Sequence, residues 1–354
     1  MVGSRTSYFS HLATHNYPLS HPHACVGMSC MVSWESKVES MTKKQLKIGT
    51  RSSALALIQS RWVKAQLEQA HPHLEIQLNI IQTKGDKILD TALSKIGDKG
   101  LFTKEIEIQL LAGAIDLAVH SLKDMPTQQP EGLTIAAITK REDPSDALVS
   151  KNGISFSDLP QGAKILSGSL RRRAQLLFRR GDLEVVDVRG NIQTRLRKLD
   201  KGKAQAIIMA AAGLKRAELE SRVTEYFAPT DFLPAPGQGA LAIEIRRDDS
   251  ATADLVSFLE DKTSRIVTTA ERTQLAHLEG GCQIPIGAYA WQENDRLHLK
   301  GMVADLDGKH ILYKDATAAI HQPEALGIEV AEKLLAAGGK EILAEIITNQ
   351  KNEP

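Results

Sequence analysis

From about residue 44 onward, apolar positions recur with the spacings of buried strands and amphipathic helices in turn. Gln45–Gly49 and Leu74–Ile81 have the short or alternating pattern typical of strands. The segment between them has helical spacing, and Ser52 or Ser53 is placed to cap the helix that it predicts. This order predicts a β-α-β unit. The expected apolar face of the helix is Leu55, Ile58, Trp62 and Val63.

The same alternation continues to about residue 140. Lys84–Gly100 predicts a loop of about 17 residues, long enough for a functional role. Thr103 is expected to cap a helix, and Arg141–Ser145, which contains Asp-Pro, predicts a boundary. The remaining elements here are a helix carrying Ile106, Leu110 and Leu111 and the strands Asp116–Val119 and Leu133–Ile138.

A second stretch repeats this scheme, and the pattern then changes. Ser169 is expected to cap a helix ending at Gly181, and a turn at Gly190-Asn191 to open the next helix. Pro234–Gly239 predicts a second crossover, followed by a strand, Leu241–Ile245, whose sheet the pattern does not assign. From residue 249, helices at about 250–260 and 264–278 precede strands near 286–291, 296–303 and 310–316 and further helices over 323–347. The other strands expected in the second stretch are Ala163–Leu166, Leu183–Val188 and Ala204–Met209.

This order predicts two α/β domains followed by a smaller C-terminal α+β domain. The chain of 354 residues is long enough for two or three domains, and 42% hydrophobic residues suffice for a sizeable core. No run approaches 18 apolar residues, so we expect no membrane span. Three cysteines cannot form a disulfide framework for a chain of this length, which favours a reducing, cytoplasmic compartment.

Residues 1–40 differ from the rest of the chain. They hold four of the eleven histidines and two of the three cysteines, with no sustained period. They lack the charged and apolar regions of a secretory signal, and their His and Cys spacing matches no closed zinc pattern. We predict a disordered extension here and no metal site.

The overall charge of +1 conceals a local concentration of positive charge. Residues 164–203 contain twelve Lys and Arg against four Asp and Glu, a net charge of +8. Arg171, Arg172 and Arg189 stand where helices begin after strands, and free backbone N–H groups at such ends bind anions. Arginine adds bidentate geometry for carboxylate or phosphate. Arg51 and Ser53 occupy the equivalent turn of the first unit.

Three further residues leave their roles open when read from the residues alone. Asp124, next to Lys123, would stay ionised among cations and could stabilise a cationic intermediate or relay a proton, or be a simple turn residue. His120 could be a general base, although a histidine that ends a buried strand is more often structural. Cys282 lies in a Gly-Gly turn with no second cysteine nearby, and could be a modified or nucleophilic cysteine or a small buried apolar residue.

The chain resembles the hydroxymethylbilane synthase (porphobilinogen deaminase) family along essentially all of residues 44–350. Any one of the matching segments is a weak signal, but their complete set in order is highly specific. The segments are 48–53 (IGTRSS), 97–102 (GDKGLF), 120–126 (HSLKDMP), 141–144 (REDP), 169–172 (SLRR), 188–191 (VRGN) with 194–196 (TRL), 233–235 (LPA), 237–239 (GQG), and 279–283 (EGGCQ) with Pro285.

The resemblance implies an enzyme, a transferase of tetrapyrrole and haem biosynthesis. Such enzymes condense four porphobilinogen molecules head to tail with release of ammonia, and then release hydroxymethylbilane by hydrolysis. They build the chain on a dipyrromethane cofactor bound through a thioether to a cysteine, which is Cys282 here. Each pyrrole brings an acetate and a propionate, which agrees with the basic segment. The implied fold has two periplasmic-binding-protein-like domains, 41–139 plus 240–257 and 145–233, and a third domain at 262–354 that carries Cys282.

The resemblance also implies roles for single residues. Asp124 would be the catalytic acid that holds pyrrole N–H groups and stabilises the cationic azafulvene formed when ammonia leaves. Gly168 departs from the family pattern, which has hydroxyl residues at all three positions 167–169, so one hydrogen bond to the cofactor would be missing or made by backbone. The implied cofactor-binding residues are Lys123, Ser167, Ser169, Arg171, Arg172, Arg195 and Gly239; the substrate-binding residues are Arg51, Ser53, Gln59, Phe102, Arg189 and Gln238; Lys95 and Lys99 belong to a mobile loop.

Two other functions remain open on the sequence. A non-catalytic, two-lobed protein that binds a small anion would share the domains and arginines, but would not need Asp124 together with Cys282. A nucleic-acid-binding protein would use the basic helices on phosphate and show steep salt dependence. We expect porphobilinogen as substrate, no nucleic-acid or membrane partner, and a monomer.

Overall fold

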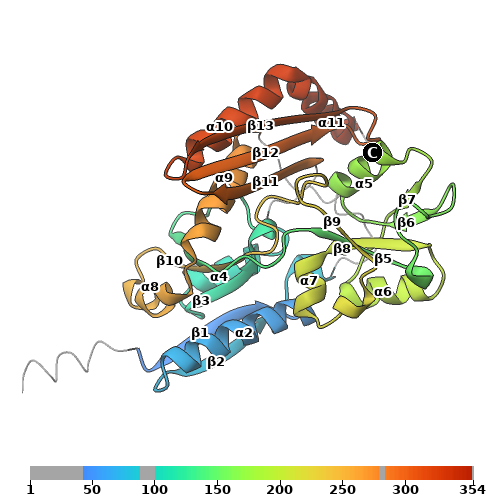
Figure 1. Cartoon of the computed structure of the whole chain (residues 1–354). Coiled ribbons are helices and arrows are strands. Elements are labelled where there is room, and N and C mark those ends of the chain that lie inside the picture. Colours follow the sequence, from blue (N-terminus) through green and yellow to red (C-terminus); the bar gives the residue numbers. More distant parts are fainter. Residues whose placement is uncertain (1–42, 88–99, 279–283, 353–354) are drawn as a thin grey trace, which may run out of the picture. The chain divides into compact units, whose positions relative to one another are not determined.

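The computed structural model describes residues 43–87, 100–278 and 284–352. These residues form three β-sheets, two of five strands and one of three, with helices packed against them (Figure 1). The predicted fold class, two α/β domains and a smaller α+β domain, is therefore confirmed. The predicted disordered extension, residues 1–40, lies outside the described residues.

The first sheet combines four strands from residues 45–138 with one strand from residues 241–246. Its strands are β1 (Gln45–Arg51), β2 (Glu75–Ile81), β3 (Leu117–Ser121), β4 (Leu133–Ile138) and β10 (Leu241–Arg246). They lie in the order β2-β1-β3-β10-β4; β1 pairs in parallel with β2 and β3, and β10 runs antiparallel to β3 and β4. The strand that the pattern left unassigned thus lies inside this sheet, as the family resemblance implies.

Helix α2 (Ala54–Ala70) follows β1, and its buried Gln59 contacts Ser121 at the end of β3. Ser53 is its N-cap and accepts a hydrogen bond from Ala56 N at 3.3 Å, which decides between the two predicted caps. The predicted apolar face is wrong at Trp62, which is 44% exposed. The buried face is Ala56, Gln59, Ser60, Val63 and Leu67, offset from the predicted one because it includes two polar residues.

The other helices of this part are shorter. At α4 (Lys104–Leu111), Thr103 occupies the predicted N-cap position, but its side chain makes no capping hydrogen bond. Part of the predicted loop forms α3 (Lys84–Lys87). Leu122–Asp124 form the single 3₁₀ turn η2 directly after β3, and α8 (Ser250–Val256) follows β10.

The second sheet has the same strand order as the first. It consists of β5 (Asp146–Ser150), β6 (Lys164–Leu166), β7 (Glu184–Val186), β8 (Ala206–Ala210) and β9 (Glu225–Phe227), in the order β7-β6-β8-β5-β9. Here β5 runs antiparallel to β8 and β9, and so takes the place that β10 has in the first sheet. The helices are α5 (Leu170–Arg179), α6 (Ile192–Asp200) and α7 (Ala211–Arg216).

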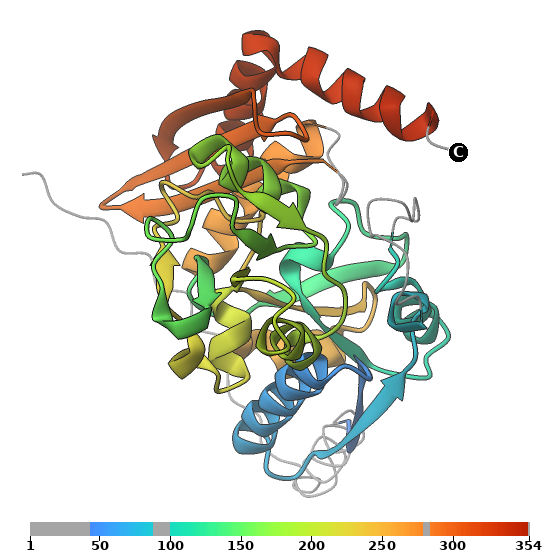
Figure 2. The same ribbon diagram turned by 90° about the vertical axis from the view of Figure 1, so that its right-hand side faces the viewer.

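The third sheet is an antiparallel meander, coloured orange to red in Figures 1 and 2. Helices α9 and α10 pack against it and against each other. Among the described residues, no helix combines the length and the apolar character that crossing a bilayer requires. The elements are β11 (Ile286–Glu293), β12 (Arg296–Ala304), β13 (Ile311–Ala319), α9 (Lys262–His277), α10 (Pro323–Leu334) and α11 (Lys340–Asn352).

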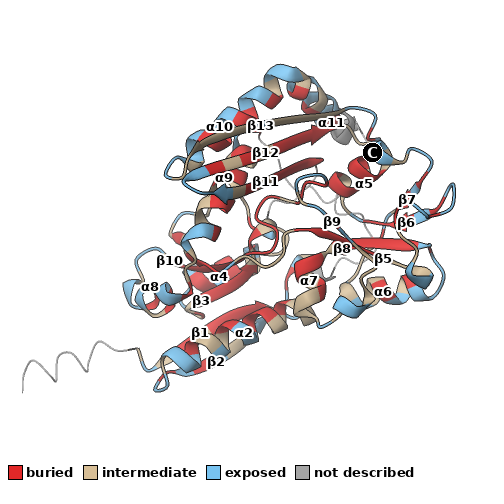
Figure 3. Cartoon of the chain, in the orientation of Figure 1, coloured by how far each residue is buried: buried red, intermediate tan, exposed pale blue. Residues whose placement is uncertain are grey.

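Each sheet has its own apolar core (Figure 3). In the first, Ile48 on β1, Leu117 on β3 and Ile243 on β10 are fully buried. Four successive residues of β3 and five of β10 are buried, as is typical of strands covered on both faces. Rigid strands therefore support the turns at their ends, where the polar residues lie.

Candidate active site

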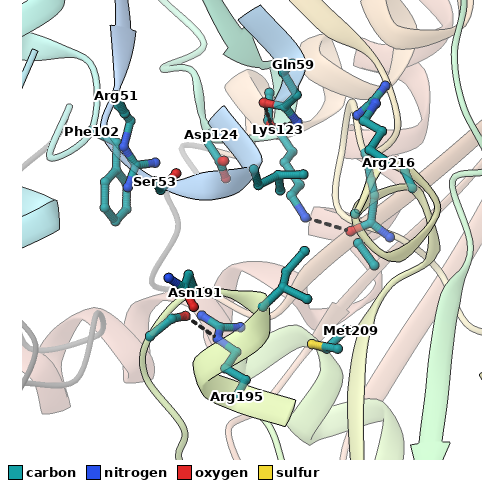
Figure 4. A pocket seen from close by; sticks show the side chains of 18 of the residues that line it. Arg51, Ser53, Gln59, Phe102, Lys123, Asp124, Asn191, Arg195, Met209 and Arg216 are labelled. Atoms are coloured by element: carbon teal, nitrogen blue, oxygen red, sulfur yellow. Dashed lines mark hydrogen bonds between the residues drawn. The ribbon is translucent and has the colours of Figure 1, made fainter. Parts of the chain in front are cut away.

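A cavity of about 710 Å³ lies where turns from both five-stranded sheets meet (Figure 4). Its walls come from the β1–α2 turn, η2, the N-terminal part of α6, α7 and the second crossover. Most of the predicted site residues in the described part of the chain line it. They are Arg51, Ser53, Gln59, Phe102, Lys123, Asp124, Arg172, Arg189, Arg195, Gln238 and Gly239.

One wall is built by turns of the first sheet. The Arg51 guanidinium lies over the Phe102 ring, 4.1 Å from its centroid, which orders both side chains at the cavity edge. Gln59, buried on α2, donates to Ser121 Oγ at 3.1 Å across to the end of β3. The α2 and β3 ends are thus held together beside the turn that carries Asp124.

Lys123 and Asp124 differ in their surroundings, although they are neighbours on η2. The Asp124 side chain is exposed to the cavity and makes no hydrogen bond or ion pair with any residue that the structure describes. Lys123 is half-buried, and its Nζ donates to Gln238 Oε1 at 3.3 Å. Burial lowers the pKa of Lys123 to about 8, with Asp124 acting against the shift and Arg172 adding to it.

The opposite wall carries cations at the start of α6. Asn191 caps this helix by accepting from Thr194 N at 2.9 Å, and the Arg195 Nε donates to Gly190 O at 2.7 Å. Figure 4 shows Asn191 and Arg195 across the cavity from Asp124. Burial, together with the charges of Arg172 and Arg189, lowers the pKa of Arg195 to about 10. The cations therefore repel one another, a cost that an anionic ligand would remove.

The remaining predicted residues do not line the cavity. Arg171 is buried and donates to Asp146 Oδ2 at 2.8 Å and to Leu233 O at 2.6 Å. Ser169 caps α5 by accepting from Arg172 N, and Ser167 is buried and accepts from Ser169 N at 3.3 Å. Cys282, Lys95 and Lys99 lie outside the described residues.

Three polar residues of this region were missed by the sequence analysis. Arg216, at the end of α7, lines the cavity and donates to Gly239 O at 2.6 Å; Lys198 lines it from α6. Asp146 lies behind the cavity and binds Arg171 and Arg172. The charge count at 164–203 includes Lys198, but α7 itself was not predicted, so nothing placed Arg216 at this edge.

His120 has a structural environment. It is 5% exposed, and its Nε2 lies 3.1 Å from Oε2 of Glu244, which is fully buried on β10. This geometry favours the structural interpretation over the general-base interpretation.

The charges of the cavity suit a ligand with several carboxylates. Lys123, Lys198, Arg195 and Arg216 bind only carbonyl or amide oxygens in the described structure, and no carboxylate lies within 4 Å of their nitrogens. The buried Nε of Arg172 has no hydrogen-bond partner among the described residues. Within residues 43–87, 100–278 and 284–352, no group of three His, Cys, Asp or Glu side chains could hold a metal ion.

The fold and the cavity define an α/β protein in which turns of two similar sheets enclose a cation-lined cavity that suits an anionic ligand. Residues 46–254 match the family model "Porphobilinogen deaminase, dipyromethane cofactor binding domain", and residues 266–336 match "Porphobilinogen deaminase, C-terminal domain". The chain belongs to the porphobilinogen deaminase family.

Curated relatives of that name are similar over nearly their whole length. The protein of Chloroherpeton thalassium is 51% identical over 87% of this chain and 99% of its own. The Geobacter sulfurreducens protein is 51% identical over 86% and 96%, and that of Prochlorococcus marinus subsp. pastoris 52% over 86% and 98%. Among solved structures, the VFT2 domain of Bordetella pertussis BvgS has a TM-score of 0.39 at 14% identity, covering 67% of this chain and 92% of that one.

Proposed function

We propose that this protein is a hydroxymethylbilane synthase. It condenses four porphobilinogen molecules head to tail, releases one ammonia at each condensation, and releases the linear product by hydrolysis. The observation that carries this proposal is the exposed carboxylate of Asp124 inside a cavity where four cations, Lys123, Lys198, Arg195 and Arg216, pair with no described carboxylate. Membership in the porphobilinogen deaminase family supports it.

The cavity cations bind the acetate and propionate groups of the pyrroles. The carboxylates of a dipyrromethane cofactor are held by Lys123, Arg172, Arg195 and the backbone at Gly239. Behind them, Ser169 caps α5, Ser167 accepts from Ser169 N, and Arg171 binds Asp146. Charge-assisted hydrogen bonds of this kind are the strong ones. The residues proposed to border the incoming substrate are Arg51, Ser53, Gln59, Phe102, Arg189 and Gln238.

The cofactor is bonded through a thioether to Cys282 and supplies the pyrrole end to which the first substrate is joined. The many cations of the cavity fit a group with four carboxylates, as does the Arg172 Nε, which has no partner in the described part of the chain. Lys95 and Lys99 lie outside the described residues and keep the role that the family resemblance implies.

Asp124 stabilises positive charge on the substrate. When ammonia leaves, the pyrrole becomes cationic, and a carboxylate with no described partner can accept its N–H groups without first breaking another interaction. Neighbouring Lys123 holds a carboxylate of the cofactor, so that the two adjacent side chains bind groups of opposite charge.

The proposal includes the organisation of the whole protein. The domain limits are 41–139 plus 240–257, 145–233 and 262–354. We propose a cytoplasmic monomer that acts on porphobilinogen and has no nucleic-acid or membrane partner.

Turnover by Asp124→Asn tests this function. The substitution removes one exposed carboxylate without a described partner, so we expect the free energy of unfolding to stay within about 0.5 kcal/mol of the parent. Porphobilinogen consumption and ammonia release should fall on the order of 100-fold or more. Asp248→Asn, at another exposed aspartate outside the cavity, is the matched control and should retain parental turnover.

Near-parental consumption in Asp124→Asn would remove Asp124 from the mechanism. A parent protein that binds porphobilinogen but releases no ammonia would instead support the non-catalytic anion-binding alternative.

A further inference from the structure

Asp146, the first residue of β5, is a fully buried carboxylate directly behind the cavity. Its two oxygens accept three side-chain hydrogen bonds. Oδ2 accepts from Arg171 Nη1 at 2.8 Å, and Oδ1 accepts from Arg172 Nη2 at 2.7 Å and from Gln238 Nε2 at 2.9 Å. Asp146 therefore joins the first turn of α5 to the second crossover.

The charge of Asp146 is fixed by these neighbours. Burial alone would raise the pKa of its carboxyl, but the two guanidiniums lower that pKa well below its usual range. Two arginines and one carboxylate leave an excess positive charge in the buried cluster. The Arg171 guanidinium donates to Asp146 and to Leu233 O, whereas Arg172 lines the cavity and its Nε has no hydrogen-bond partner among the described residues.

The same carboxylate helps to orient the Gln238 amide. Three acceptors surround Gln238 Nε2: Pro144 O at 2.7 Å, Ser145 O at 3.2 Å and Asp146 Oδ1 at 2.9 Å. The amide nitrogen must face them, because an oxygen there would meet only other acceptors. The amide oxygen is thereby directed to Lys123 Nζ at 3.3 Å, the contact dashed beside Lys123 in Figure 4.

We propose that Asp146 is a positioning residue for the cavity: it holds Arg172 and the Gln238 amide in the orientations that present cations to ligand carboxylates. It also provides the negative charge that offsets the neighbouring positive charges of Arg171, Arg172 and Lys123. That the ligand is a pyrrole carboxylate rests on the proposed function. The contacts of Asp146 do not.

The pKa of Lys123 depends on the charge of Asp146. The charged groups that act on it are Asp124 on its own turn, Arg171 and Arg172 on α5, and Asp146 on β5. Asp146 raises the pKa of Lys123 against the lowering caused by burial and by the arginines. Loss of the Asp146 charge should therefore lower the pKa of Lys123 further, whereas a general loss of stability would not.

The test compares Asp146→Asn with its parent in two measurements. The pKa of Lys123 is measured by competitive acetylation and peptide mass spectrometry in full-length Cys282→Ala chains with and without Asp146→Asn. The share of purified protein that carries the two-pyrrole mass is measured in the chains that retain Cys282. We expect a lower Lys123 pKa and a severalfold smaller share in Asp146→Asn.

Asp116→Asn is the matched control. Asp116 is a partly buried carboxylate that pairs with Lys43 and Arg246 outside the cavity, so both readouts should remain parental. A folded Asp146→Asn with parental values of either readout overturns the positioning role.

If Asp146→Asn does not fold, Gln238→Met tests the same chain of contacts at its next member. It removes the amide that Asp146 orients and should also lower the Lys123 pKa, whereas an unchanged pKa overturns the proposal. A parent protein without the added mass would refute the proposed function, and the Lys123 pKa would still decide the role of Asp146.

Discussion

Arg171 and Arg172 are adjacent at the start of α5, yet only Arg172 lines the cavity. Arg171 is directed away by Asp146 and Leu233 O. The pair itself was predicted from its place at a helix N-terminus. The different roles of the two arginines were not predicted, because Asp146 lies on strand β5, 25 residues before Arg171, and belongs to no motif. Likewise, the sequence did not predict that Asp124 is exposed and Lys123 half-buried, because the turn η2 determines which way each side chain points.

The backbone around Gly168 leaves no room for a side chain. A Cβ at this position would lie 2.7 Å from Val188 O, a backbone atom that cannot move aside cheaply. Gly168→Ser should therefore lower the free energy of unfolding by about 1–3 kcal/mol and should not add a useful hydroxyl for the cofactor. Urea unfolding measures the change.

Gly181→Ser is the control for that experiment, since a Cβ there would meet only Leu177 O at an ordinary 3.6 Å. If Gly168→Ser proved as stable as Gly181→Ser, the steric account of this departure from the family pattern would be wrong.

At the scale of elements, prediction succeeded where caps and long periodic segments coincide. The helices α2, α5 and α6 begin after Ser53, Ser169 and Asn191, whose side chains accept backbone N–H groups. The missed elements lack such signals. They include β5, only five residues long and preceded by a proline-containing boundary, β9, which has three residues, and α7, whose N-cap Ala210 has no side-chain hydrogen bond.

Asn191→Ala tests the link between the α6 cap and the cavity. The change removes the acceptor for Thr194 N and should cost about 1 kcal/mol of stability. Because Arg195 lies in the first turn of α6, the KM for porphobilinogen should rise as well.

Asp261→Ala removes the corresponding cap of α9, where Asp261 accepts from Ser264 N at 2.7 Å. It should cost similar stability with an unchanged KM. Equal KM values in the two variants would show that the α6 cap has no special relation to the cavity.

For the whole molecule, the net charge of +1 averages away the distribution that matters. Basic residues of 164–203 and cations of the first sheet meet in one cavity, because both sheets have the same strand order and two segments join them, Arg141–Ser145 after β4 and Pro234–Gly239 before β10. Periodicity predicted most strands but not that β10 returns to the first sheet, because strand pairing over more than 100 residues leaves no local pattern. The family resemblance supplied that pairing and the importance of Cys282.

The intact mass of the purified full-length protein tests the central claim most directly. We predict that the protein is heavier than its polypeptide by two linked pyrrole units and that Cys282→Ala lacks this excess. A parent protein that consumes porphobilinogen but has the mass of the bare polypeptide would contradict the account.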